Sequence, residues 1–223
     1  MERCWRYGVV TEGVASKRGM SPYSHGQRRK WPSRCPWHTI ADSLLRNFRF
    51  TLLLSLRLIP QVMKKLGVIA DTHDHLDRIA LAVALLHKQG AEGLLHLGDF
   101  VAPFALKAVL KFNGPLYAIY GNNDGEKKGL KKVFPELRDG PSVYELAGRK
   151  LGVAHSVEEI PEAYRTECDG VFYGHSHARV HIPKQGARAL ELNPGEACGW
   201  LTGKPSLAML DLETMTAEIL DIQ

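Results

Sequence analysis

The amino-acid sequence predicts an α/β protein with a mainly parallel sheet followed by a second, more antiparallel sheet. From Met63 onward, short apolar runs rich in β-branched and aromatic residues alternate with stretches of helical periodicity. This alternation is typical of βαβ crossovers, which make a sheet parallel. After Asp139-Gly140-Pro141 the apolar runs are separated mostly by tight turns, which favour antiparallel neighbours.

Three strands and two helices are predicted before this change. The strands are apolar runs with the length of a buried strand, at residues 66–70, 93–97 and 116–120. The helices cover residues 76–89 and 103–111. In the first helix Ile79, Val83 and Leu86 recur at helical spacing and form one apolar face.

Five further apolar runs are expected to build the second sheet. They cover residues 142–147, 150–155, 169–174, 187–192 and 206–220. No internal repeat or low-complexity tract interrupts them. We therefore expect residues 63–223 to form one domain of ordinary size.

Residues 1–62 differ from this domain in charge and in pattern. They contain 11 Lys and Arg against 3 Asp and Glu, whereas residues 63–223 contain 18 against 21, so the net charge of +5 originates in the first segment. We therefore expect no nucleic-acid binding by the domain. The first segment has the composition of an organelle transit sequence, but Met63-Lys64-Lys65 opens directly onto the first strand. We expect a basic extension that is disordered or absent from the natural product.

The remaining composition is typical of a cytoplasmic protein. The four cysteines show no Cys-x-x-Cys spacing, which predicts reduced thiols. The longest apolar stretch, residues 51–60, is short and is interrupted by Arg57, so neither a membrane span nor a membrane partner is expected.

Residues of metal-binding type follow five of the predicted strands. In an open α/β sheet the carboxyl ends of the strands meet at one crevice, so side chains distant in sequence can converge there. The seven candidates for one cluster are Asp71, His73, Asp99, Asn122, His155, His175 and His177. They supply oxygen and imidazole nitrogen but no thiolate, a set that suits Mn, Fe, Co, Ni or Zn.

Each motif also has an ordinary structural interpretation. Gly98-Asp99 and Gly121-Asn122-Asn123-Asp124-Gly125 are typical of turns, and Asp71 can cap the helix that follows it. Gly174-His175-Ser176-His177 is the most informative motif, because two imidazoles one residue apart can reach two neighbouring cations. His96 is interpreted as a buried, hydrogen-bonded histidine rather than a ligand.

The order and strand-end placement of these motifs resemble one known arrangement. The pattern D-x-H, G-D, G-N-H-[DE], H and G-H-x-H belongs to the calcineurin-like metallophosphoesterase superfamily. Asp71-Thr-His-Asp-His75 and the segment 193–203 are similar to the small single-domain YfcE-type phosphodiesterases of bacteria and archaea. The resemblance covers residues 63–223.

The resemblance implies a four-layer αββα sandwich, with two mixed sheets flanked by helices, that binds two divalent metal ions. By motif, one ion would be held by Asp71, His73 and His177, and the other by Asn122, His155 and His175. Asp99 would bridge them. The implied reaction is hydrolysis of a phosphate ester, above all a phosphodiester, by in-line attack of a metal-bridging hydroxide. Mn²⁺ is the expected ion, with Ni²⁺, Co²⁺, Fe²⁺ and Zn²⁺ as alternatives.

Two positions depart from the family pattern. Asn123 stands where the broader family has a histidine that stabilises the transition state or protonates the leaving group, and an amide is no acid near neutral pH. We still assign Asn123 to the catalytic residues together with Asp99. Ser156 follows His155 where glycine is frequent, which leaves the turn after that strand open.

Two non-hydrolytic alternatives also remain open. One is a protein-binding scaffold of the same fold, like the retromer subunit, and the other is a nucleotide-binding regulatory module. The expected partner of the enzyme is a small phosphate-ester substrate, and a homo-oligomer is possible in either case.

Overall fold

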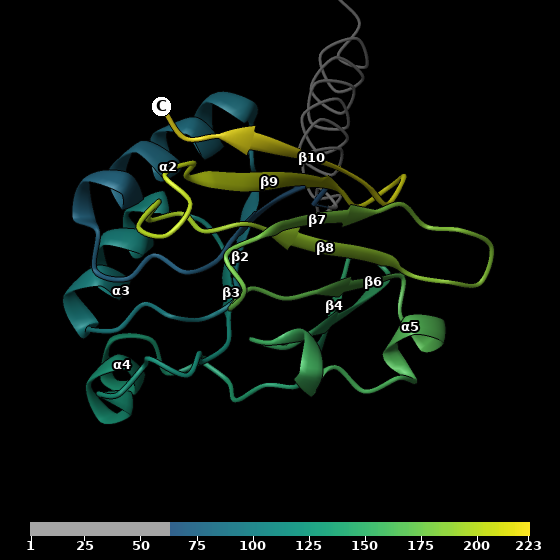
Figure 1. Ribbon diagram of the computed structural model, residues 1–223, viewed down its shortest axis with the longest axis horizontal. Helices are drawn as coiled ribbons and strands as arrows, with labels where there is room; N and C mark the ends of the chain where they lie inside the picture. The colour runs from purple at the N-terminus through teal and green to yellow at the C-terminus, as the bar shows by residue number, and fades with distance from the viewer. Residues whose placement is uncertain (1–62) are drawn as a thin grey trace, which may run out of the picture. The chain divides into compact units, whose positions relative to one another are not determined.

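The computed structural model describes residues 63–223, which contain two five-stranded sheets (Figure 1). The predicted N-terminal extension lies outside the described residues. Both sheets mix parallel and antiparallel pairs.

The first sheet has the strand order β10-β9-β1-β2-β3. Its strands are β1 (Lys65–Ile69), β2 (Gly93–His96), β3 (Leu116–Ala118), β9 (Ser206–Asp211) and β10 (Thr216–Asp221). The first three are parallel, as predicted. The β9–β10 hairpin pairs antiparallel beside β1, so the assignment of residues 206–220 to the second sheet was wrong. Tight turns identify a hairpin but do not determine which sheet it joins, and β9 is apolar enough for a place beside the buried β1.

The second sheet has the order β4-β5-β6-β8-β7. Its strands are β4 (Ser142–Leu146), β5 (Arg149–Val153), β6 (Gly170–Phe172), β7 (Arg179–Ile182) and β8 (Leu190–Pro194). The outer pairs are antiparallel, whereas β5, β6 and β8 run parallel, so this sheet is less antiparallel than predicted. Strand β7 was not predicted because it is a largely exposed edge strand without an apolar run.

Helices and 3-10 turns complete the chain. They are α2 (Leu76–Gln89), α3 (Pro103–Val109), η1 (Leu110–Phe112), α4 (Lys127–Val133), η2 (Val157–Glu159) and α5 (Tyr164–Glu167). Helix α2 buries the predicted face formed by Ile79, Val83 and Leu86. Helix α4 was not predicted, because it contains four lysines and buries only one residue, Leu130.

The two sheets pack face to face around an apolar core. Val68 of β1, Leu151 of β5 and Phe172 of β6 belong to this core and are fully buried. A second core lies between the first sheet and helices α2 and α3, which Figure 1 shows on the outer side of that sheet. A third, around Val171 and Tyr173, packs the second sheet against the segment that contains α5. This confirms the predicted four-layer arrangement.

Among the described residues, no helix is long and apolar enough to cross a membrane.

Candidate metal centre

The loops that follow β1, β2, β3, β5 and β6 bring the seven predicted candidates together. Contacts of 3.9 Å or less join them into one network of carboxylates, imidazoles and one amide. The network spans both sheets, because Asp71, His73 and Asp99 follow strands of the first sheet and the three other histidines follow strands of the second.

The backbone at these strand ends is held in a conformation that side chains other than glycine rarely adopt. Positive φ angles occur at Asp71 (54°), His73 (38°), Asp99 (60°), His175 (64°) and His177 (58°). Each such residue costs roughly 1–2 kcal/mol relative to ordinary backbone. Backbone strain of this kind is frequent at functional sites, where the surrounding structure holds the residues in the strained conformation.

Backbone hydrogen bonds tie the first two of these loops together. The amides of Thr72 and His73 donate to the carbonyl of Asp99, and the amide of Asp71 donates to the carbonyl of Gly98. Gly98 has φ 101°, as predicted for a sharp turn, and a Cβ there would lie 2.6 Å from the Gly121 nitrogen. The turns after β2 and β3 therefore touch only because glycine occupies this position.

Asp71, His73 and His177 form one half of the cluster. Nε2 of His177 lies 3.3 Å from Nε2 of His73 and 3.6 Å from Oδ1 of Asp71. Oδ1 of Asp71 is fully buried and is the one buried side-chain oxygen or nitrogen in residues 63–223 without a hydrogen-bond partner. Burial raises the pKa of Asp71 to about 6, against the influence of His155 and His177.

This half of the cluster fits a cation. An unsatisfied buried acceptor costs roughly 1–3 kcal/mol, and two imidazole nitrogens face it. A divalent ion bonded to these donors would remove that penalty and would compensate the buried negative charge.

Glu196 fixes the orientation of His177. Nδ1 of His177 donates to Oε2 of Glu196 over 2.7 Å, which leaves the lone pair of Nε2 directed at the cluster. The fully buried Glu196 carboxylate also accepts from the backbone of Leu201 and Thr202 and from the Thr202 hydroxyl. Burial opposes ionisation, but these hydrogen bonds outweigh it and lower the pKa of Glu196 to about 2. The sequence analysis missed this residue, because nothing in the chain marks a glutamate 19 positions after a histidine as its partner.

Asn122, His155 and His175 form the other half. Oδ1 of Asn122 lies 2.8 Å from Nε2 of His155 and 2.8 Å from Nδ1 of His175. Nδ1 of His155 donates to the Leu97 carbonyl over 2.8 Å, so Nε2 is the ring nitrogen that faces the cluster. The Asn122 oxygen thus contacts one imidazole nitrogen of each histidine.

Asp99 connects the halves. Its Oδ2 lies 3.5 Å from Nε2 of His73 and 3.4 Å from Nε2 of His155. Burial alone would raise the pKa of Asp99, but hydrogen bonds and charge from His155 and hydrogen bonds from Asn123 hold it well below its usual range. Conversely, burial would lower the pKa of His155, yet Asp99 raises it to about 9.

Asn123 lies against Asp99. Its backbone amide donates to Oδ1 over 2.8 Å and its side-chain amide donates to Oδ2 over 2.7 Å. Asp124, buried next to it, accepts from the backbone amides of Asp99, Val101 and Gly121 and so fixes the turn. The structure thus gives Asn123 a contact with the central carboxylate that its family position did not predict.

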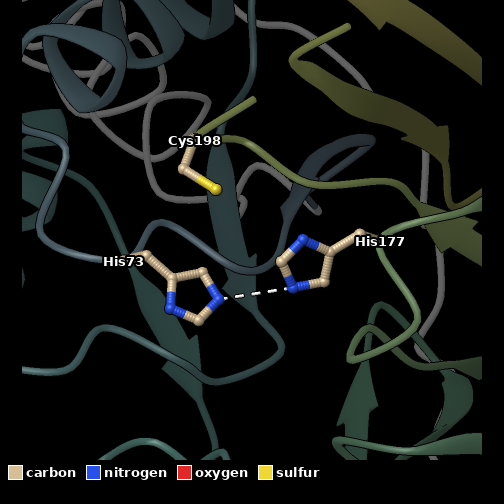
Figure 2. Close-up of side chains that lie close together, drawn as sticks. All are labelled: His73, His177 and Cys198. Carbon is tan, nitrogen blue, oxygen red and sulfur yellow. Dashed lines mark hydrogen bonds between the residues drawn. The ribbon is translucent and has the colours of Figure 1, made fainter. Parts of the chain in front are cut away.

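A thiol also lies near the cluster, although the seven predicted candidates include none. Sγ of Cys198 and one nitrogen each of His73 and His177 lie within 4.8 Å of one another, and Figure 2 shows the thiol pointing toward the two rings. Sγ donates to Oε2 of Glu196 over 3.2 Å. Burial raises the pKa of this thiol to about 12.

The residues around the cluster behave largely as expected. His96 is fully buried and lies 3.2 Å from the Thr72 hydroxyl, which confirms its interpretation as a hydrogen-bonded histidine. A pocket of about 210 Å³ adjoins Asn122 and His155 and is lined further by Tyr120 and Lys127.

Comparison with known proteins connects this geometry with a family. The profile of the calcineurin-like phosphoesterase superfamily domain matches residues 63–215. Phosphodiesterase MJ0936 of Methanocaldococcus jannaschii is 35% identical over 157 residues, which make up 67% of this chain and 93% of that protein. A solved structure of an archaeal phosphodiesterase is 34% identical, with a TM-score of 0.64 over 70% of this chain and 99% of that one.

Two more distant structures share the fold. YfcE, a phosphoesterase from E. coli, has a TM-score of 0.55 at 20% identity, over 71% of this chain and 100% of its own. Vps29 from Entamoeba histolytica, solved with Zn²⁺, has a TM-score of 0.51 at 17% identity, over 71% and 99% of the two chains.

Proposed function

The chain belongs to the calcineurin-like phosphoesterase superfamily, and on this premise we propose that it is a phosphodiesterase that holds two divalent cations in the cluster. One cation would be held by Asp71, His73 and His177, and the other by Asn122, His155 and His175. Asp99 would be shared. Mn²⁺ is the ion we expect from the family resemblance. These oxygen and nitrogen donors accept several divalent ions, and availability decides among them.

The position of Asp99 carries this proposal. A carboxylate shared by two cations must face both ligand sets, and one oxygen of Asp99 lies within 3.5 Å of a histidine nitrogen from each half. A turn aspartate with a purely structural role would instead direct its oxygens to backbone amides, as Asp124 does. Asp99 accepts a hydrogen bond from only one backbone amide through Oδ1, that of Asn123. Its Oδ2 faces the two histidines and accepts from the Asn123 side chain.

Cations bound here would supply a hydroxide nucleophile near neutral pH and would neutralise charge on the phosphate oxygens. The protein residues supply position. Glu196 and the Leu97 carbonyl hold the protons of His177 and His155 on the nitrogens that face away from the cluster. The exposed His175 and Asn122 lie at the solvent side, where a small phosphate ester can approach.

Asn123 limits the substrates. Its amide donates a hydrogen bond but supplies no proton to a departing alkoxide. We therefore expect efficient hydrolysis of phosphodiesters with good leaving groups and slow hydrolysis of simple alkyl esters. Such an enzyme would act on a small substrate in the cytoplasm.

The scaffold alternative requires no hydrolysis. It would be favoured by loss of coordinating side chains, whereas each of the seven candidate positions holds one. The regulatory alternative predicts binding of a nucleotide without turnover.

One assay separates these functions. The purified protein with Mn²⁺ is predicted to hydrolyse bis(4-nitrophenyl) phosphate, and both a chelator and Asp99→Asn are predicted to abolish the activity. Glu213→Gln, a change at a side chain that is 70% exposed and paired with Lys64, serves as the control and should be neutral. Full activity of the Asp99 variant, or of the chelated protein, would refute the proposal.

A further inference from the structure

An exposed tryptophan stands beside the candidate metal centre. Trp200 is 62% exposed, although tryptophan is a large apolar residue that usually buries most of its surface. Its ring stacks on His75, with centroids 4.5 Å apart and planes inclined by 20°. Its indole nitrogen donates to the carbonyl oxygen of His73 over 3.4 Å.

The position of Trp200 is fixed relative to the candidate ligands from two directions. The indole N–H donates a hydrogen bond to the backbone carbonyl of His73, which is one of the candidate ligands. The next two residues, Leu201 and Thr202, donate backbone amides to Glu196, the same carboxylate that orients His177. Trp200 thus lies in a loop that is held by Glu196, the residue that also orients His177 in the cluster.

The surroundings of the indole are also apolar and exposed. Leu201 is 76% exposed, and Leu76, which follows His75 in the chain, is 46% exposed. Single exposed apolar residues need no explanation, but an exposed tryptophan held in place by a stacked ring at the edge of a polar cluster has the features of a binding surface.

We propose that Trp200, backed by His75, is a stacking platform for a planar aromatic group of the substrate, such as a nucleobase. The proposal rests on the proposed phosphodiesterase function and specifies its substrate class. The phosphate would lie at the cluster and the aromatic ester group would lie over the indole. An aromatic face accepts any base, so the platform selects aromatic over aliphatic esters without selecting one base.

The other side of the cluster has a different character. The pocket beside Asn122 and His155 is lined by Tyr120, Lys127, Asp139 and Glu159. The Lys127 ammonium lies over the Tyr120 ring and pairs with Asp139 over 3.3 Å. The lining of this pocket is mostly polar and charged, and Lys127 already covers the Tyr120 ring, so the aromatic group belongs on the side of Trp200.

The test compares two probes that differ only in the base. Adenosine 5′-monophosphate and ribose 5-phosphate carry the same sugar and phosphate, and their dissociation constants can be measured by calorimetry on the Mn²⁺-loaded full chain. The wild-type protein is expected to bind the nucleotide about tenfold more tightly, the effect of roughly 1.4 kcal/mol of base stacking. Trp200→Ala is expected to abolish this preference without changing the affinity for ribose 5-phosphate, and Trp200→Phe is expected to restore most of it.

Leu201→Ala is the matched control, because it removes another exposed apolar side chain from the same loop and leaves the indole in place. It is expected to keep the full preference for the nucleotide. Equal affinity of the wild-type protein for both probes, or equal weakening of both by Trp200→Ala, would overturn the platform. If only the platform is wrong, the wild-type protein still hydrolyses bis(4-nitrophenyl) phosphate with Mn²⁺. If the proposed function is wrong, this Mn²⁺-dependent hydrolysis is absent.

Discussion

At the scale of single residues, the candidate site depends on side chains that hold the candidate ligands through hydrogen bonds as much as on the ligands themselves. Glu196 holds His177 in one orientation, and Asn123 holds Asp99. Neither contact was predicted from the sequence. The ligand candidates were found because they stand in short motifs of ligating residues after apolar runs. The pairing of Glu196 with His177 has no local signal and becomes visible only when the fold brings β6 and β8 side by side.

Glu196→Gln tests the role of this partner. The amide keeps the size of the side chain but loses one acceptor oxygen, so His177 can turn and present the wrong nitrogen. We expect the affinity for Mn²⁺ to fall about 10–100-fold, as measured by titration calorimetry. The matched control is Glu191→Gln, which alters another buried carboxylate, one paired with Arg165 and Arg188, and should leave the Mn²⁺ affinity unchanged. Equal affinity in wild-type protein and Glu196→Gln would show that His177 needs no such support.

Asn123→His tests the assignment of the leaving-group position. A histidine there can protonate a departing alkoxide, and general acid catalysis contributes roughly 10²-fold or more. We expect kcat on an alkyl phosphodiester to rise by about that factor, with little change on bis(4-nitrophenyl) phosphate, whose leaving group needs no proton. Asn123→Ala provides the comparison, since it removes the bond to Asp99 and adds no acid. A similar change of both rates in Asn123→His would contradict the assignment.

At the scale of elements, most of the regular structure was predictable and its assembly was less so. The strands β1, β2, β5 and β6 and the helix α2 were predicted within a residue or two, because each buries an apolar face of the corresponding period. The sheet that the β9–β10 hairpin joins was predicted wrongly, since strand pairing over 140 residues leaves no trace in local periodicity. Helix α4 and strand β7 were not predicted, because both are largely exposed and neither buries an apolar face.

The turns at the strand ends allow a matched pair of glycine substitutions. A Cβ at Gly121 would overlap the Asp99 carboxylate, whereas a Cβ at Gly125, in the same turn, meets nothing within 4 Å. Gly121→Ala is expected to lower the free energy of unfolding by about 1–3 kcal/mol and to weaken Mn²⁺ binding. Gly125→Ala should change the unfolding free energy by less than about 0.5 kcal/mol. Denaturant titration of both variants measures this, and similar stability of the two would mean that the turn yields around Asp99.

At the scale of the whole molecule, all seven candidate ligands and both sheets lie within residues 63–223. We propose that this domain is the functional unit and that residues 1–62 are dispensable. A chain that begins at Met63 is predicted to keep its Mn²⁺-dependent activity within about twofold of the full chain, measured as kcat/KM on bis(4-nitrophenyl) phosphate. Insoluble or inactive protein after this truncation would assign residues 1–62 to the fold or to the site.

The central claim is that Asp99 lies between two cation positions rather than beside one. The most direct measurement is the number of Mn²⁺ ions bound per chain, determined by elemental analysis after equilibration with Mn²⁺ and removal of the free ion. We predict two ions for the wild-type protein and fewer than two for Asp99→Asn, with the Glu191→Gln control retaining both. A wild-type stoichiometry of one or none, or two ions that persist in Asp99→Asn, would contradict the shared carboxylate.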